Sequence, residues 1–365
     1  MTLSTRRSSL RSRLAVLAVV GLAFVATHVL LESIARFSER HLDAFLWKQQ
    51  DYLRLFAASN YVGLGRGRLL IYGPSEAREG LLPDVIARGV AGLAPYQHSQ
   101  SLGTLEDGLF VLSYIERAYG RTAIPDAILL GITTRFIGDL RPRPSPLQEG
   151  TNRYSPHFRI VEGSSPPALT PRSWWEAVQA DLALLALQPD RYRRGVYAVA
   201  SRIATRVVPS FAENRWSWVP ISPAKYLEGR YASEEGTRRW LVTPGNHWEL
   251  VHSWDPERDR ARVTREIGVL LDYTRRHGIA LYVVNLPELS WNRDLYRPGR
   301  YEAYLEIVRA ALGDTPFLDL RTFLADDDFF DDAHPVWSAG IRVSTRVATF
   351  IREHRTRDLT LRRTQ

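Results

Sequence analysis

The residues best suited to chemistry are a serine near the start of the chain and an Asp-x-x-His sequence near its end. Ser75 follows an apolar segment in the sequence Gly73-Pro74-Ser75, and Asp331 and His334 lie three positions apart with Asp332 between them. A hydroxyl, an imidazole and a carboxylate that meet in space can act as nucleophile, general base and orienting group. These residue types favour acyl transfer through a covalent acyl-serine.

Each half of this pattern also has a simpler interpretation. Serine is a common helix cap, and Ser75 precedes the helix-forming residues Glu76 to Glu79. The acidic segment 326–332 is also typical of a solvated loop, in which His334 would be incidental. The two halves considered jointly favour catalysis over capping.

Apolar segments and helical patterns alternate along the chain. Strands are predicted at 68–72, 94–97, 127–132, 279–286 and 316–320, and helices at 104–119, 258–277, 300–312 and 338–353. This alternation predicts an α/β fold, in which helices cover both faces of a parallel sheet and ligands bind at the carboxyl ends of the strands. Ser75 would then lie at that edge, near a helix N-terminus whose N–H groups can hold an oxyanion.

The stretch 141–254 breaks the alternation and is predicted to be a helical insertion that caps the sheet. The α/β core is therefore expected at 67–140 and 255–355, followed by a basic tail at 356–365. Tryptophans gather in or just beyond the insertion, and buried packing is favoured over glycan contact for most of them. They are Trp174, Trp175, Trp216, Trp218, Trp240, Trp248, Trp254 and Trp291.

The N-terminus has the pattern of a membrane anchor. Residues 1–13 contain four arginines and no acid, and 14–31 are mostly apolar. An uncleaved anchor is predicted over 1–35, followed by a juxtamembrane helix over 36–66. The arginines precede the span, which predicts a single-pass inner-membrane protein whose main domain is periplasmic or extracellular.

Several other classes of function are disfavoured. The chain has no cysteine, and its arginines are scattered rather than gathered in a stripe despite a net charge of +8. His247 and His252 lack a metalloprotease spacing, and the glycines of 63–67 precede their strand, which is the wrong context for a dinucleotide fingerprint. We therefore expect no nucleic-acid partner, no metal and no cofactor.

Four segments together resemble the SGNH or GDSL-like hydrolase superfamily, in particular its membrane-anchored, extracytoplasmic acyltransferase-like members such as alginate O-acetylation proteins and the DltD type. They are 68–80, Gly103 in 100–103, the strand end at Gly131, and 331–340. The resemblance implies a flavodoxin-like three-layer α/β/α fold, with Ser75 as nucleophile, His334 as base and Asp331 as the orienting carboxylate. Asp332 is the alternative carboxylate.

The resemblance also implies an oxyanion hole made by the N–H groups of Ser75 and Gly103 and by a third side chain. That third donor is normally asparagine, and Thr133 occupies its position here. A threonine hydroxyl is shorter than an amide, and the loss of one oxyanion donor typically costs about 10²- to 10³-fold in turnover. Thr134 and Arg135 are the neighbours that could replace it.

A serine O-acyltransferase or esterase acting on an extracytoplasmic polysaccharide or cell-envelope glycan is the function that this resemblance implies. Its expected partners are the glycan, the membrane through the N-terminal helix, and a multispanning membrane protein that donates the acyl group. Two alternatives remain open: a noncatalytic binding or assembly partner of a membrane acyltransferase, and a lipid or small-ester hydrolase.

Overall fold

The computed structural model describes two units of the chain. The described residues are 4–41, 59–100, 103–138, 146–155, 157–161, 168–186, 255–294, 296–329 and 333–364, with separate positions between 189 and 203. One unit comprises residues 1–46 with 186–221, and the other comprises 47–185 with 222–365. The larger unit carries the residues proposed for chemistry.

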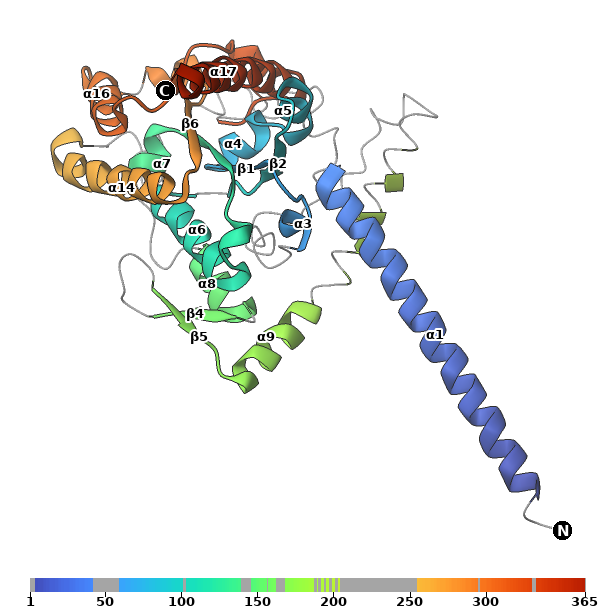
Figure 1. Cartoon of the computed structure of the whole chain (residues 1–365). Helices are drawn as coiled ribbons and strands as arrows, with labels where there is room; N and C mark the ends of the chain where they lie inside the picture. Colours follow the sequence, from blue (N-terminus) through green and yellow to red (C-terminus); the bar gives the residue numbers. More distant parts are fainter. Residues whose placement is uncertain are drawn as a thin grey trace. The chain divides into compact units, whose positions relative to one another are not determined.

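A five-stranded parallel sheet forms the centre of the larger unit (Figure 1). Its strands are β1 (Arg68–Tyr72), β2 (Ala94–Gln97), β3 (Ala127–Ile132), β6 (Ala280–Asn285) and β7 (Phe317–Asp319). They lie in the order β2-β1-β3-β6-β7, which is 2-1-3-4-5 when counted along the chain. This is the order of doubly wound sheets of the flavodoxin type. The predicted α/β class with a parallel sheet is confirmed.

Burial on both faces explains why the central strands are continuous apolar segments. Every residue of β3 is buried, and in β1 only Arg68 is partly exposed. The register pairs Leu70 with Ile128 and Leu130 with Val283. Successive side chains of these strands therefore point to opposite faces of the sheet, and each face packs on its own layer of helices.

One layer consists of α4 (Ser75–Gly80), α5 (Pro83–Gly89) and α17 (Trp337–Thr364). Its core joins side chains from these helices to alternate residues of β1, β3 and β6, among them Leu69, Ile71, Leu129, Val284, Ala77, Ile86, Val343 and Val347. The backbones of α17 and α4 lie so close together that a Cβ atom added at Gly340 would be only 2.7 Å from the carbonyl oxygen of Glu79. Ser344 fixes this contact by accepting from Leu82 N at 2.7 Å and donating to Gly80 O at 2.9 Å.

The opposite layer consists of α6 (Leu105–Tyr119), α14 (Pro256–His277) and α16 (Arg300–Leu312). A capping box between Thr104 and Asp107 begins α6. Gly108 lets this helix approach the sheet, because a Cβ there would lie 2.7 Å from the Tyr72 ring. α14 packs on α6 and α16, and it ends at Gly278 in the left-handed conformation.

The segment between β3 and α14 begins with α7 (Thr134–Gly138), α8 (Pro146–Tyr154) and α9 (Trp174–Leu185). It also contains an antiparallel pair, β4 (Phe158–Ile160) and β5 (Leu169–Pro171), where the sequence analysis predicted helices alone. Strands of three residues give too short an alternation to be recognised from sequence.

The tryptophans of the insertion only partly follow the expectation of burial. Trp174 and Trp175 are 78% and 57% exposed, so these two are not among the buried ones. Trp291 is half-buried. Trp216, Trp218, Trp240, Trp248 and Trp254 lie outside the described residues.

The smaller unit contains the predicted apolar N-terminal helix, α1 (Ser4–His41). Within it, Leu14–Ser38 is long and apolar enough to cross a membrane. Residues 42–58 of the predicted juxtamembrane helix lie outside the described part, which resumes at α3 (Ser59–Val62). At the other end of the chain, α17 continues through the predicted basic tail to Thr364, since no glycine or proline stops it after Gly340.

Replacing Ser344 with alanine tests the contact between α17 and α4. Ser344→Ala leaves a buried N–H and a buried carbonyl without this partner, so we expect the free energy of unfolding to fall by roughly 1–3 kcal/mol. Thr345→Ala is the matched control, because Thr345 is exposed and bonds only within its own helix, to Ile341 O. Urea unfolding of both variants in detergent checks this, and equal stability of the two would contradict the bridging role.

Candidate active site

The strand order identifies the edge of the sheet where a ligand is expected. β1 lies between β2 and β3, so the chain leaves β1 toward one side of the sheet and later continues from β3 toward the other. Ligand crevices form at such a switch point, outside the carboxyl ends of the two strands. Ser75 follows β1 and Thr133 follows β3 directly, so the fold brings both predicted residues to this point.

Ser75 is the first residue of α4, and Pro74 is the N-cap residue. The capping interpretation of Ser75 is therefore wrong. Its hydroxyl instead donates to Oε2 of Glu76 at 3.1 Å, and the residue is only 7% exposed. The turn between β1 and α4 thus presents the hydroxyl at the sheet edge, where it is largely buried and bonded to a carboxylate.

Gly73 allows the close packing around this turn. A Cβ at Gly73 would lie 2.6 Å from both Gly131 O and the Ala77 side chain, so a larger residue does not fit between β1, β3 and α4. The loop after β2 docks on the same turn, with Gln100 N donating to Gly73 O at 2.9 Å. Gly103 also lies against this turn, since a Cβ atom added to it would be 3.0 Å from Gly73 O.

The N–H group of Gly103 does not have the orientation that an oxyanion donor needs. It donates to Gln100 O at 3.0 Å. Gly103 thus lies beside the Ser75 turn as the resemblance implies, but its N–H is used within its own loop. Thr134, one possible replacement donor, is hydrogen-bonded through its hydroxyl to Tyr296, and the Arg135 side chain is outside the described part.

His334 belongs to a short loop held at both ends. Phe329 and Pro335 form an antiparallel bridge, and Val336 N donates to Asp328 O at 2.8 Å. α17 starts three residues after His334 and packs on α4, the helix that Ser75 begins. His334 is half-buried in this loop, whereas Asp331 and Asp332 lie outside the described residues.

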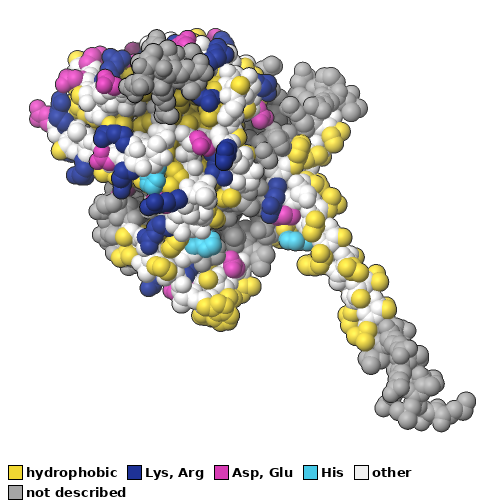
Figure 2. All heavy atoms as spheres, in the orientation of Figure 1, with side chains coloured by type: hydrophobic (Ala, Val, Ile, Leu, Met, Phe, Trp, Pro, Cys, Tyr) yellow, Lys and Arg dark blue, Asp and Glu magenta, His cyan; other side chains and the backbone are white. Residues whose placement is uncertain are grey.

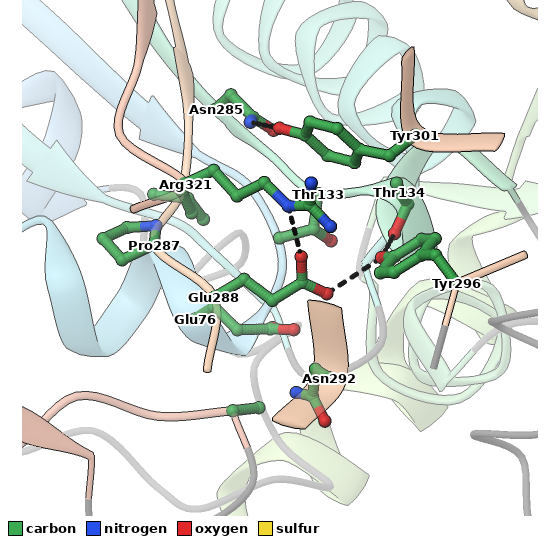
Figure 3. A pocket seen from close by; sticks show the side chains of 12 residues that line it. Glu76, Thr133, Thr134, Asn285, Pro287, Glu288, Asn292, Tyr296, Tyr301 and Arg321 are labelled. Carbon is green, nitrogen blue, oxygen red and sulfur yellow. Dashed lines mark hydrogen bonds and ion pairs between the residues drawn. The ribbon is translucent and has the colours of Figure 1, made fainter. Parts of the chain in front are cut away.

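A pocket at the carboxyl edge of the sheet joins these segments (Figure 3). Its wall includes Glu76, Thr133 and Ala333, which are the chain neighbour of Ser75, the predicted oxyanion residue and the chain neighbour of His334. The remaining wall comes from Thr134, Asn285, Leu286, Pro287, Glu288, Asn292, Tyr296, Tyr301 and Arg321. Segments more than 250 positions apart in sequence therefore border one cavity.

A charged and aromatic cluster forms the wall contributed by the loops after β6 and β7. The guanidinium of Arg321 donates from Nε to Glu288 at 2.9 Å and lies over the Tyr301 ring, 3.2 Å from its centroid. The Tyr296 hydroxyl donates to the other oxygen of Glu288 at 2.9 Å. Burial, and then the charge of Glu288, raise the pKa of Tyr296 well above its ordinary value. The phenol is therefore a fixed, protonated donor.

Asn285 holds the ends of β6 and β7 together behind this cluster. Its Nδ2 donates to Tyr301 OH at 2.6 Å and to Asp319 Oδ1 at 2.8 Å, while its Oδ1 accepts from Tyr304 OH at 3.0 Å. The sequence analysis predicted none of these residues as part of the site. Their positions in the sequence could have indicated them, because Asn285, Glu288 and Arg321 all lie at or directly after the carboxyl end of a predicted strand, where ligands are expected.

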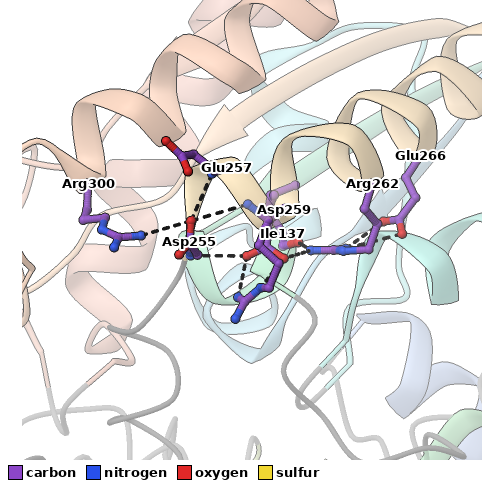
Figure 4. A network of polar contacts seen from close by, with 8 residues as sticks. Ile137, Asp255, Glu257, Asp259, Arg262, Glu266 and Arg300 are labelled. Atoms are coloured by element: carbon purple, nitrogen blue, oxygen red, sulfur yellow. Dashed lines mark hydrogen bonds and ion pairs between the residues drawn. The ribbon is translucent and has the colours of Figure 1, made fainter.

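Thr133 is positioned by α7 and α14. Its Oγ1 accepts from Phe136 N at 3.2 Å, which caps α7 and leaves the hydroxyl hydrogen to donate elsewhere. Arg262 of α14 donates to Ile137 O at 2.6 Å and pairs with Glu266 at 3.2 Å (Figure 4). In the same network Asp255 caps α14 by accepting from the backbone N–H groups of Glu257 and Arg258. This network fixes the loop after β3.

No protein-family model and no curated protein matches this chain. Among the residues that the structure describes, no group of three or more His, Asp and Glu side chains is placed to hold a metal ion. The geometry of the pocket is therefore the basis for assigning a function.

The pair of Glu288 and Arg321 can be tested by mutation. The two side chains are only 18% and 15% exposed, so Glu288→Gln leaves Arg321 without a charged partner and should lower the free energy of unfolding by roughly 1–3 kcal/mol. Glu302→Gln, on the exposed face of α16, is the control and should change it by less than about 0.5 kcal/mol. Denaturant unfolding measures both, and an unchanged Glu288→Gln variant would refute the structural role of the pair.

Proposed function

We propose that this protein is a membrane-anchored serine O-acyltransferase or esterase with an SGNH-type three-layer α/β/α fold. The observation that supports this most is the shared pocket, whose wall contains the chain neighbours of Ser75 and His334 together with Thr133. Its location at the switch point of the sheet adds to that support, since ligands bind there in doubly wound folds.

The proposed reaction has two steps. The Ser75 oxygen attacks an ester carbonyl while His334 takes the hydroxyl proton, and Asp331 orients the imidazole and stabilises its charged form. The tetrahedral intermediate expels the alcohol, which receives the proton from His334, and an acyl-serine remains. A sugar hydroxyl or water then attacks the acyl-serine and loses its proton to His334; the tetrahedral intermediate expels the Ser75 oxygen, which receives that proton from His334, and the acylated sugar or the free acid leaves.

The reaction places two requirements on the site, one on the Ser75 hydroxyl and one on the groups that hold the oxyanion. The Ser75 hydroxyl must rotate from Glu76 toward His334, which is a change between staggered rotamers. Oxyanion stabilisation must come from the N–H groups of the first turn of α4 and from Thr133, because the Gly103 N–H is bonded to Gln100. We therefore expect a low kcat unless substrate binding releases the Gly103 N–H from Gln100 O.

The composition of the pocket fits an acceptor rich in hydroxyl groups. Glu76, Glu288, Asn292 and Tyr296 contribute carboxylate, amide and phenol groups to the wall. Such groups pair with sugar hydroxyls better than with a lipid chain. We propose an extracytoplasmic polysaccharide or cell-envelope glycan as acceptor, inner-membrane anchoring with the catalytic domain outside the cytoplasm, and a multispanning membrane protein as acyl donor.

A noncatalytic glycan-binding or assembly role is the second candidate. The 7% exposure of Ser75, its hydrogen bond to Glu76 and the engaged N–H of Gly103 favour it. In that case the pocket would hold a glycan without chemistry.

Acylation of Ser75 distinguishes the two candidates. The full-length chain in detergent is incubated with an activated acetyl ester, and peptide mass spectrometry is expected to find acetyl on Ser75. Ser75→Ala should abolish turnover, and His334→Ala should lower it by about 10²- to 10⁴-fold through loss of the general base. Thr345→Ala should leave turnover unchanged. Folded protein that never acquires acetyl on Ser75 would exclude the enzyme and leave the binding role.

Thr133 provides a separate test of the oxyanion site. Thr133→Asn restores an amide donor and retains an oxygen that can cap α7, so we expect kcat to rise, by up to about 10²-fold. Thr133→Val removes the hydroxyl at nearly constant volume and should lower kcat. Steady-state kinetics with the activated ester measure both, and identical kcat values in the three proteins would show that Thr133 does not contact the oxyanion.

A further inference from the structure

A second segment of the chain lies against the C-terminal end of α1 in the smaller unit. Ser38 Oγ donates to Gly195 O at 2.9 Å, and the Tyr192 hydroxyl is 3.0 Å from Nδ1 of His28. The described positions between 192 and 203 are helical. The contact therefore joins α1 to a helical segment more than 150 positions later in the sequence.

Small residues make this contact close. A Cβ on Gly195 would lie 2.9 Å from Cα of Ala35, and both residues are buried. Among the described side chains of α1, the buried or partly buried ones are Leu31, Glu32, Ile34, Ala35 and Ser38; four of them, Leu31, Ile34, Ala35 and Ser38, have the spacing of one helical face. Close approach through glycine and alanine is typical of helices that pack within membranes.

The contact lies where the apolar part of α1 ends. At about 1.5 Å per residue, 14–31 extends roughly 27 Å, close to the thickness of a bilayer's hydrocarbon core of about 30 Å. In this part the apolar side chains are exposed along the helix (Figure 2), with Leu22 and Phe24 70% and 73% exposed. If α1 spans the bilayer, residues 28–38 reach from the acyl chains into the headgroups. The segment docked on them then lies at the membrane boundary.

The composition of the segment suits that boundary. Val196 and Ile203 are 39% and 58% exposed. The stretch 191–206 contains no acidic residue and five arginines, namely Arg191, Arg193, Arg194, Arg202 and Arg206. Apolar positions on a helix rich in arginine are the pattern of helices that lie in the interface, where each basic residue near an anionic surface contributes about 1 kcal/mol.

We propose that the described helical positions between 192 and 203 belong to an interfacial element, docked on α1 through Gly195, with Val196 and Ile203 inserted at the boundary between lipid headgroups and acyl chains of an anionic bilayer. The chain is then held to the membrane by two elements rather than one. The proposal requires α1 to span the membrane and is independent of any chemistry at Ser75.

The absence of native cysteine allows a direct test with single labels. Val196→Cys and Ile203→Cys in the full-length chain, each carrying an environment-sensitive fluorophore, are reconstituted in vesicles of phosphatidylcholine and phosphatidylglycerol. We expect blue-shifted emission that is quenched by lipids with a nitroxide near the headgroup more than by lipids with a deep nitroxide. Val20→Cys in α1 is the deep reference, and Thr345→Cys on α17 is the aqueous reference.

Three outcomes would overturn the proposal. Labels at 196 and 203 that emit as in water, while the label at 20 is deeply quenched, would leave α1 as the only membrane element. Blue-shifted labels that lipid nitroxides do not quench would indicate contact with protein, such as a second copy. A water-like label at 20 would remove the span itself.

Two changes test what holds the segment. Gly195→Val introduces a side chain against Ala35, so the shallow quenching of the label at 196 should fall while that of the label at 20 stays constant. Vesicles of phosphatidylcholine alone should weaken the quenching at 203, because they lack the anionic charge that attracts the arginines. Quenching that neither change alters would contradict both the Gly195 contact and the lipid preference.

Discussion

Ser344 bonds at the same time to Gly80 O and Leu82 N, and the structure around the site depends on this buried bridge. It holds α17 against the end of α4, where Gly340 leaves room for the backbone at Glu79. α4 begins at Ser75 and α17 begins just after His334, so this contact determines how far apart the two segments can lie. Glu76 and Ala333, the chain neighbours of Ser75 and His334, line the same pocket at this edge of the sheet.

Hydrogen bonds and charge pairing hold the wall of the pocket that the loops after β6 and β7 form. The guanidinium of Arg321 lies over the Tyr301 ring and also near the Tyr296 ring, and its charge is balanced by Glu288. Burial raises the pKa of Tyr301 as well as that of Tyr296, so both phenols remain protonated at neutral pH. The cluster therefore offers a ligand donors and acceptors whose positions are already determined, and little of their order has to be created on binding.

Sequence alone predicts most of the sheet, because β1 and β3 are buried on both faces and are continuous apolar segments. It predicts less where a structure depends on few residues or on distant partners. β4 and β5 are too short for a periodic signal, and the exposure of Trp174 and Trp175 depends on neighbours that composition does not reveal. In the site, Ser75 and Thr133 follow the ends of β1 and β3, and Ala333, the chain neighbour of His334, lines the same pocket as Thr133. The partner of the Ser75 hydroxyl and the direction of the Gly103 N–H depend on rotamers and loop geometry, which residue types do not determine.

The order of the segments along the chain also matters while the protein is being made. Synthesis runs from the N-terminus, so Ser75 is present long before the last thirty or so residues that form α17. Until then one face of the sheet, with Leu69, Ile71 and Val284, lacks its final cover. A nascent chain thus carries the proposed nucleophile without its base. In the proposed reaction, Ser75 therefore becomes reactive only after α17 has docked on α4, the helix that Ser75 begins.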